Sequence, residues 1–126
     1  MIDKIYIEEA IRIRKEYLKN LLNVTKFEKV YQEIFDKLEK EKEKVSNFDA
    51  DIITQDDIFK YVKQLEVDLN LILDKIRPYI EKINDLDNEQ RILYNNIKEK
   101  YIDITDEEIY KEIIPVIEKI DENFEL

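Results

Sequence analysis

The 126-residue chain contains no Gly, no Cys, no His and only two Pro, and 41% of its residues are charged, giving a net charge of -10. Without Gly it has no loop that could cradle a phosphate and few of the residues that β-turns need. Without Cys and His it lacks disulfides, a thiol nucleophile, the commonest general base and the commonest transition-metal ligands. Hydrophobic residues make up 44% of the chain and recur with helical period, which predicts a single all-α domain.

The first expected helix covers residues 3–47, because nothing in this stretch forces a break. Its first half has a wide apolar face, formed by Ile7, Ala10, Ile11, Ile13, Tyr17, Leu18, Leu21, Leu22 and Val24. At about 100° per residue this face covers roughly half the circumference, which is too wide for one partner helix. From Phe27 to Phe48 the face narrows to one seam at 3–4 spacing, the width that one partner covers. The first half therefore predicts two neighbouring helices and the second half predicts one.

The second expected helix covers residues 55–103. Thr54 is a suitable N-cap residue, and Asp57, three residues later, completes a pattern like a capping box. The apolar seam keeps its 3–4 spacing across Pro78, which predicts one helix kinked near that proline. The polar stretch around Asp87 leaves a second interpretation open, in which this region forms two helices.

The third expected helix covers residues 106–124. Thr105 is its expected N-cap, and Glu108 lies three residues later, as in a capping box. Pro115 predicts either a kink or two short helices that meet there.

The lengths of these helices predict how they assemble. The two long helices are joined by one loop, residues 46–53, so they should form an antiparallel hairpin. The third helix is at most about 30 Å long and can cover only the end of the hairpin that carries the termini. We therefore expect a three-helix bundle at that end and a two-helix coiled-coil arm beyond it. Leu18 should then face two helices and Leu38 only one, so Leu18→Ala should destabilise the protein more.

The negative charge is concentrated in residues 103–126, which carry a net charge of -7, whereas residues 1–48 carry +1 and residues 49–102 carry -4. Two interpretations are open. The acidic third helix packs against the basic first helix, or it offers an acidic surface to a basic partner.

Two groups of carboxylates lie outside obvious helical faces, within residues 49–57 and 85–89. The second group resembles a calcium-binding loop but lacks the Gly and the position-twelve Glu that such a loop needs. We therefore predict no metal, no cofactor and no catalytic residue, so the protein is not expected to be an enzyme. An enzyme built on Asp49, Asp51, Asp85 and Asp87 is the distant alternative.

We expect no direct binding to nucleic acid, because the chain is acidic overall and its basic cluster lies beside the face that the acidic third helix should cover. That cluster consists of Arg12, Arg14, Lys15 and Lys19. No signal peptide is visible, and no stretch approaches the roughly 20 apolar residues of a membrane span. A cytoplasmic protein that does not associate with membranes is expected.

The leading functional hypothesis is a non-enzymatic module for protein interaction or assembly, which presents the coiled-coil arm and the acidic C-terminal helix. Its partner would be another protein or a second copy of the chain, as a homodimer. The alternative is an acidic mimic of nucleic acid that inhibits a basic nucleic-acid-binding protein. Candidate partner-binding residues are Phe35, Phe59, Tyr61 and Tyr110, with the acidic Asp106, Glu107, Glu112, Glu118, Asp121 and Glu122.

Overall fold

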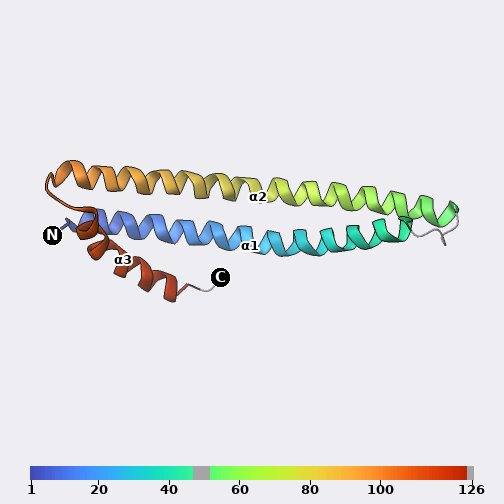
Figure 1. Cartoon of the computed structure of the whole chain (residues 1–126), viewed down its shortest axis with the longest axis horizontal. Coiled ribbons are helices and arrows are strands. Elements are labelled where there is room, and N and C mark those ends of the chain that lie inside the picture. Colours follow the sequence, from blue (N-terminus) through green and yellow to red (C-terminus); the bar gives the residue numbers. More distant parts are fainter. Residues whose placement is uncertain (47–51, 125–126) are drawn as a thin grey trace. The chain divides into compact units, whose positions relative to one another are not determined.

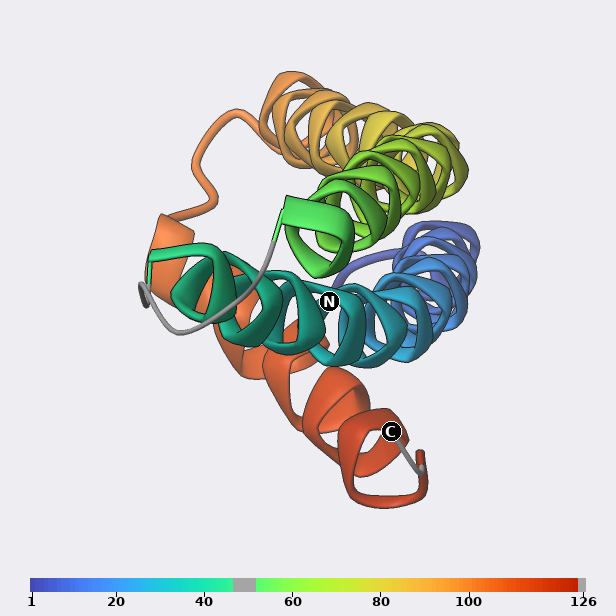
Figure 2. The ribbon, with the colours of Figure 1, turned by 90° about the vertical axis from the view of Figure 1, so that its right-hand side faces the viewer.

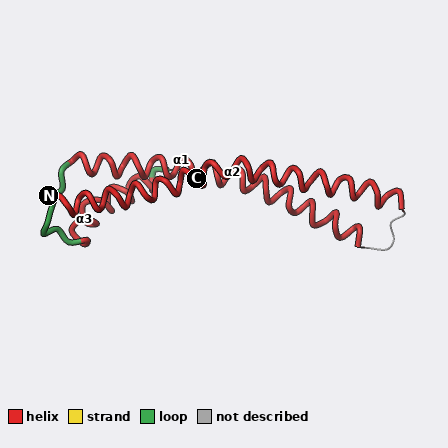
Figure 3. Tube along the Cα trace, turned by 90° about the horizontal axis from the view of Figure 1, so that it is seen from above, coloured by secondary structure: helices red, strands yellow, loops and turns green. Residues whose placement is uncertain are grey.

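A computed structural model of the chain describes residues 1–46 and 52–124. These residues form three α-helices and no strand: α1 (Lys4–Ser46), α2 (Ile52–Lys100) and α3 (Asp106–Glu122). Figure 3 shows helix over nearly all of the described chain, with short loops at residues 1–3 and between α2 and α3. The predicted all-α fold class is confirmed. Within the described residues, no helix carries a hydrophobic stretch sufficient to cross a bilayer.

The start of α2 differs from the expectation. The helix begins at Ile52, so Thr54 lies inside it and the predicted N-cap at Thr54 is wrong. The N-cap of this helix could not be assigned from the sequence, because aspartates just upstream of Thr54 are equally suitable residues for starting a helix. Most of the expected loop, residues 47–51, lies outside the described residues.

Both prolines lie inside continuous helices. α2 runs through Pro78 without interruption and shows no break near Asp87, so the two-helix interpretation of this region is wrong. α3 likewise runs through Pro115, which excludes two short helices. A helix can lose one backbone hydrogen bond at a proline when tertiary packing on both sides holds it. The kinks expected at these prolines stay predictions.

The chain forms two compact units. Unit 1 consists of Met1–Leu22 and Tyr79–Leu126, and unit 2 is Asn23–Pro78. Unit 1 therefore contains the start of α1, the end of α2 and all of α3. Its core comprises Ile2, Ala10, Ile13, Leu86, Leu93, Ile97, Ile109 and Ile113. Because all three helices contribute to this core, unit 1 is the predicted three-helix bundle.

α3 is an integral part of unit 1. Its Ile109 and Ile113 side chains are 1% and 0% exposed, so the helix is docked by its apolar face. In Figures 1 and 2 its C-terminal half lies on the side of α1 that faces away from α2. The wide apolar face of early α1 is therefore explained by two neighbours, as the sequence predicted.

The start of α3 is capped as predicted. The Thr105 hydroxyl oxygen accepts a hydrogen bond from the Glu108 backbone N–H at 3.2 Å, and the Glu108 carboxylate accepts one from the Thr105 N–H at 3.4 Å. Asp106 and Glu107 add negative charge in the first turn, which favours the positive end of the helix dipole.

Unit 2 is formed by the end of α1 and the start of α2. Its buried core consists of Leu38, Val62, Leu65 and Leu69, with Tyr31, Ile34 and Ile58 packed against them. These residues belong to the predicted seams, so the two helices pair through one apolar face each.

Leu38 was expected to be less well covered than Leu18, because it faces one helix and not two, and this expectation is wrong. Leu38 is 3% exposed and Leu18 is 4% exposed, although unit 2 has only two helices. Leu38 belongs to a cluster with three apolar residues of α2 and is flanked by Tyr31 and Ile34 of its own helix, and these neighbours suffice to cover it.

Replacing Thr105 with Ala is expected to lower the free energy of unfolding by about 1 kcal/mol, because the Glu108 N–H loses its acceptor. Thr105→Ser keeps the hydroxyl and should restore most of the stability. Urea unfolding followed by circular dichroism measures both. Equal stability of the Ala and Ser variants would show that the capping box contributes nothing.

Leu18→Ala and Leu38→Ala are expected to destabilise the protein by similar amounts, each within the range of about 2–5 kcal/mol for buried leucines. The reason is their nearly equal burial. Chemical unfolding of the two variants under identical conditions tests this. A much smaller loss for Leu38→Ala would mean that the core of unit 2 is looser than its burial indicates.

Candidate interaction surfaces

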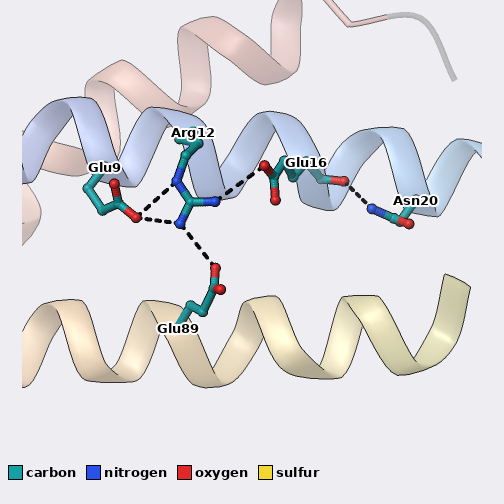
Figure 4. A network of polar contacts seen from close by, with 5 residues as sticks. All are labelled: Glu9, Arg12, Glu16, Asn20 and Glu89. Carbon is teal, nitrogen blue, oxygen red and sulfur yellow. Dashed lines mark hydrogen bonds and ion pairs between the residues drawn. The ribbon is translucent and has the colours of Figure 1, made fainter. Parts of the chain in front are cut away.

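A polar network joins α1 to α2 within unit 1 (Figure 4). The guanidinium group of Arg12 donates to Glu9 at 2.9 Å, and it forms ion pairs with Glu16 at 3.3 Å and with Glu89 of α2 at 3.1 Å. The Asn20 amide donates to the Glu16 carbonyl oxygen at 2.8 Å. Hydrogen bonds to Glu9 and Glu89 raise the pKa of Arg12, and the bond to Arg12 lowers the pKa of Glu9. Arg12 and Glu89 thus serve the fold rather than a ligand.

The first residues of the chain are tied to the rest of unit 1. The Ile2 backbone N–H donates to the Glu112 carboxylate at 2.8 Å, and the Asp3 N–H donates to the Tyr101 hydroxyl oxygen at 2.9 Å. Lys100 forms an ion pair with the Asp3 carboxylate. Glu112, a candidate for partner binding, therefore already accepts a hydrogen bond from another segment of the same chain.

Two more of the candidate acidic residues are also engaged. Asp121 accepts two hydrogen bonds from Arg14, at 2.8 and 2.9 Å, and Asp106 pairs with Lys98 at 2.6 Å. These contacts hold α3 against α1 and α2. Of the two interpretations left open by the sequence, packing of the acidic helix on the basic start of α1 is the one that the structure shows.

The remaining acidic candidates lie at the surface. Glu107, Glu118 and Glu122 are exposed and make no ion pair or side-chain hydrogen bond to other described residues. A shallow depression of about 550 Å³ on α3 brings two of them together with Tyr110, and its lining is Glu107, Tyr110, Lys111, Ile114, Pro115 and Glu118. Tyr110 is half-exposed and packs edge-to-face on Tyr94, with 6.0 Å between ring centroids.

Unit 2 exposes large apolar side chains beside its seam. Phe35, Phe59 and Leu73 are 37%, 50% and 43% exposed. If the seam residues occupy heptad positions a and d, all three residues fall at position e. In an antiparallel pair the e positions of both helices lie on the same side, so these residues form one surface, which we name the e flank. The sequence identified Phe35 and Phe59 but missed Leu73, although the same spacing would have found it.

The other aromatic candidate of unit 2 lies elsewhere. Tyr61 is 44% exposed and occupies position g, together with Val30 of α1. Tyr61 is therefore on the side of unit 2 opposite to the e flank, and the structure does not bring it together with Phe35 and Phe59.

The two carboxylate groups considered for metal binding have different outcomes. Asp85 and Asp87 lie exposed on α2, and within residues 1–46 and 52–124 no three potential ligands of the types Asp, Glu, His and Cys come together. Asp49 and Asp51 lie outside the described residues.

Comparisons with protein-family models, with curated proteins and with solved structures find no match to this chain. The functional inference therefore depends on the chemistry of the surfaces described above.

The Asp3–Lys100 pair predicts a specific response to pH. The hydrogen bond from Lys100, followed by the contact with Tyr101, lowers the pKa of Asp3 below its ordinary value of 3.8. A lowered pKa in the folded state means that the contact stabilises the protein above the unfolded pKa and is lost as the pH falls through the folded pKa. Lys100→Gln should therefore raise the pKa of Asp3 toward 3.8, measured by NMR titration of the carboxyl carbon.

The matched control for that titration is Lys82→Gln, which removes one exposed lysine of α2 that makes no contact with Asp3. The pKa of Asp3 should not change in this variant. Equal shifts in both variants would mean that net charge, and not the ion pair, sets the pKa.

Proposed function

We propose that this chain is a non-catalytic assembly module that pairs with a second copy of itself through the e flank of unit 2. The observation that supports this proposal is the exposure of Phe35, Phe59 and Leu73 on one side of a two-helix unit. Phe59 and Leu73 are 14 residues apart on α2, or about 21 Å at 1.5 Å per residue, so the flank is long enough to receive another helix.

The energetic reason is the cost of leaving this surface in water. Each helix of unit 2 buries only one face, and its core cluster contains four buried residues, none of which is among the fully buried side chains of the described chain. Burying apolar area contributes about 25 cal/mol per Å², so a helix laid along the e flank recovers stability that the hairpin lacks. Two hairpins that meet in this way form a four-helix bundle, a common soluble arrangement.

The charge distribution favours a second copy as the partner. Unit 2 contains 10 basic and 13 acidic residues, a net charge of -3, whereas unit 1 carries -7. A contact with two-fold symmetry places identical surfaces together, so like charges repel least where the net charge is smallest. Tyr61 and Val30 lie on the opposite side, so they would stay exposed in such a dimer and remain available to bind another protein.

A second candidate function is the acidic mimic of nucleic acid. It is supported by the exposed Glu107, Glu118 and Glu122, which make no ion pair with the other described residues. It is the weaker candidate because Asp106, Glu112 and Asp121 already hold α3 in place. Competition with DNA or RNA for a basic protein, steeply weakened by salt, would be its signature.

Self-association is measured by sedimentation velocity across micromolar concentrations. The expected result is a dimer of the 15.4 kDa chain that Phe35→Glu or Leu73→Glu dissociates without loss of helical circular dichroism. These substitutions place a charge in the proposed contact while leaving the seam residues in place.

The matched control is Val67→Glu, because Val67 is 51% exposed and occupies heptad position f, away from the e flank. The dimer should persist in this variant. A 15.4 kDa species at every concentration, or equal dissociation by Val67→Glu, would refute pairing through the e flank.

A further inference from the structure

Unit 1 contains an open groove between α1 and α3 that the assembly proposal does not use. Its volume is about 500 Å³, and its floor is apolar, formed by Ile11 of α1, by Val116 and Ile120 of α3, and by Phe124, which follows the end of α3. None of these four side chains belongs to the core of unit 1. They form a second apolar surface that docking of α3 leaves partly exposed. Figure 1 shows why, since α3 diverges from α1 toward its C-terminal end.

The rim of the groove is basic. Lys15 and Lys19 line it from α1, and Lys119 lines it from α3, while no Asp or Glu is among its lining residues. Lys15 and Lys119 form no ion pair with any described residue. In a chain whose net charge is -10, three lysines around one apolar groove are a local reversal of sign.

The width of the groove is held by a charged contact. Arg14 donates two hydrogen bonds to Asp121, at 2.8 and 2.9 Å, beside the groove. Paired hydrogen bonds between guanidinium and carboxylate fix geometry as well as distance. The groove is therefore preformed, and a ligand would not have to separate the two helices.

The spacing of the lining residues fits a helix better than a small molecule. Val116 and Ile120 are one helical turn apart on α3, with Phe124 just beyond the end of that helix, and Ile11, Lys15 and Lys19 repeat every four residues on α1. The row on α1 is about 12 Å long at 1.5 Å per residue. These two helix faces, which diverge toward the C-terminal end of α3 (Figure 1), bound a groove into which a row of side chains from another helix can pack.

We propose that this groove binds an amphipathic helix of a partner protein whose apolar stripe is flanked by acidic residues. The stripe lies on Ile11, Val116 and Ile120, and the flanking carboxylates meet Lys15 and Lys19 on one side and Lys119 on the other. Lysines on both rims favour several carboxylates spread along a helix over the single carboxylate of a fatty acid.

The test uses a fluorescein-labelled peptide of about 18 residues, or five helical turns, with leucines at i, i+3, i+4 and i+7 and glutamates on both sides of them. Fluorescence anisotropy at low salt should show saturable binding to the wild-type chain. A peptide with glutamine in place of each glutamate should bind at least about tenfold more weakly. NMR shift changes of the wild-type protein should map to the lining residues.

Variants locate the site independently. Lys15→Glu combined with Lys119→Glu should weaken binding at least about tenfold. The matched control is Lys82→Glu combined with Lys111→Glu, which makes the same change in net charge at exposed positions of unit 1 outside the groove, and it should bind as the wild type does. Circular dichroism confirms that each variant is folded.

The proposal is overturned if the wild-type chain does not bind the glutamate peptide, if the glutamine peptide binds equally well, or if both double variants weaken binding equally. Saturable binding of a fluorescent fatty acid to the groove, with no binding of the peptide, would also overturn it and assign the groove to an anionic amphiphile.

Discussion

The packing of one apolar seam of α1 against one apolar seam of α2 is the interaction on which each unit depends. In unit 1 it forms the floor on which α3 docks, through Ile109 and Ile113. In unit 2 it is the whole core. Because the seam occupies only one face of each helix, every other apolar residue must be covered by α3 or left in water. The candidate surfaces follow from this constraint.

Much of the fold could be predicted from the sequence because it depends on helical period and length. The 3–4 spacing fixed which faces of α1 and α2 are buried, and the short reach of the third helix limited it to the end of the hairpin with the wide apolar face. The start of α2 could not be fixed, because several residues upstream of Gln55 favour an N-cap. The extent to which Leu38 is buried depends on how the neighbouring side chains pack around it, and the periodicity of the sequence does not describe that packing.

The candidate surfaces were predicted less completely, for a related reason. Exposure of Phe35 and Phe59 follows from their place beside a seam, so the sequence found them. The pairing of Arg12 with Glu89, or of Arg14 with Asp121, depends on the register between helices to within one residue. Periodicity does not set that register, so several acidic residues expected at a free surface proved to be internal contacts. The basic groove depends on the angle at which α3 leaves α1, which no local pattern encodes.

The distribution of aromatic contacts gives the docking of α3 an optical signature. The chain has eight Tyr and no Trp, so its near-ultraviolet spectrum comes mainly from tyrosine. Tyr94 of α2 packs against Tyr110 of α3, and Tyr6 of α1 packs against Tyr101, whereas the Tyr31–Phe35 stack lies within α1 alone. The dichroism of these two tyrosine pairs of unit 1 therefore depends on contacts between segments, whereas that of the Tyr31–Phe35 stack depends on one helix alone. Loss of tertiary packing around α3 would be visible while the helical content is still intact.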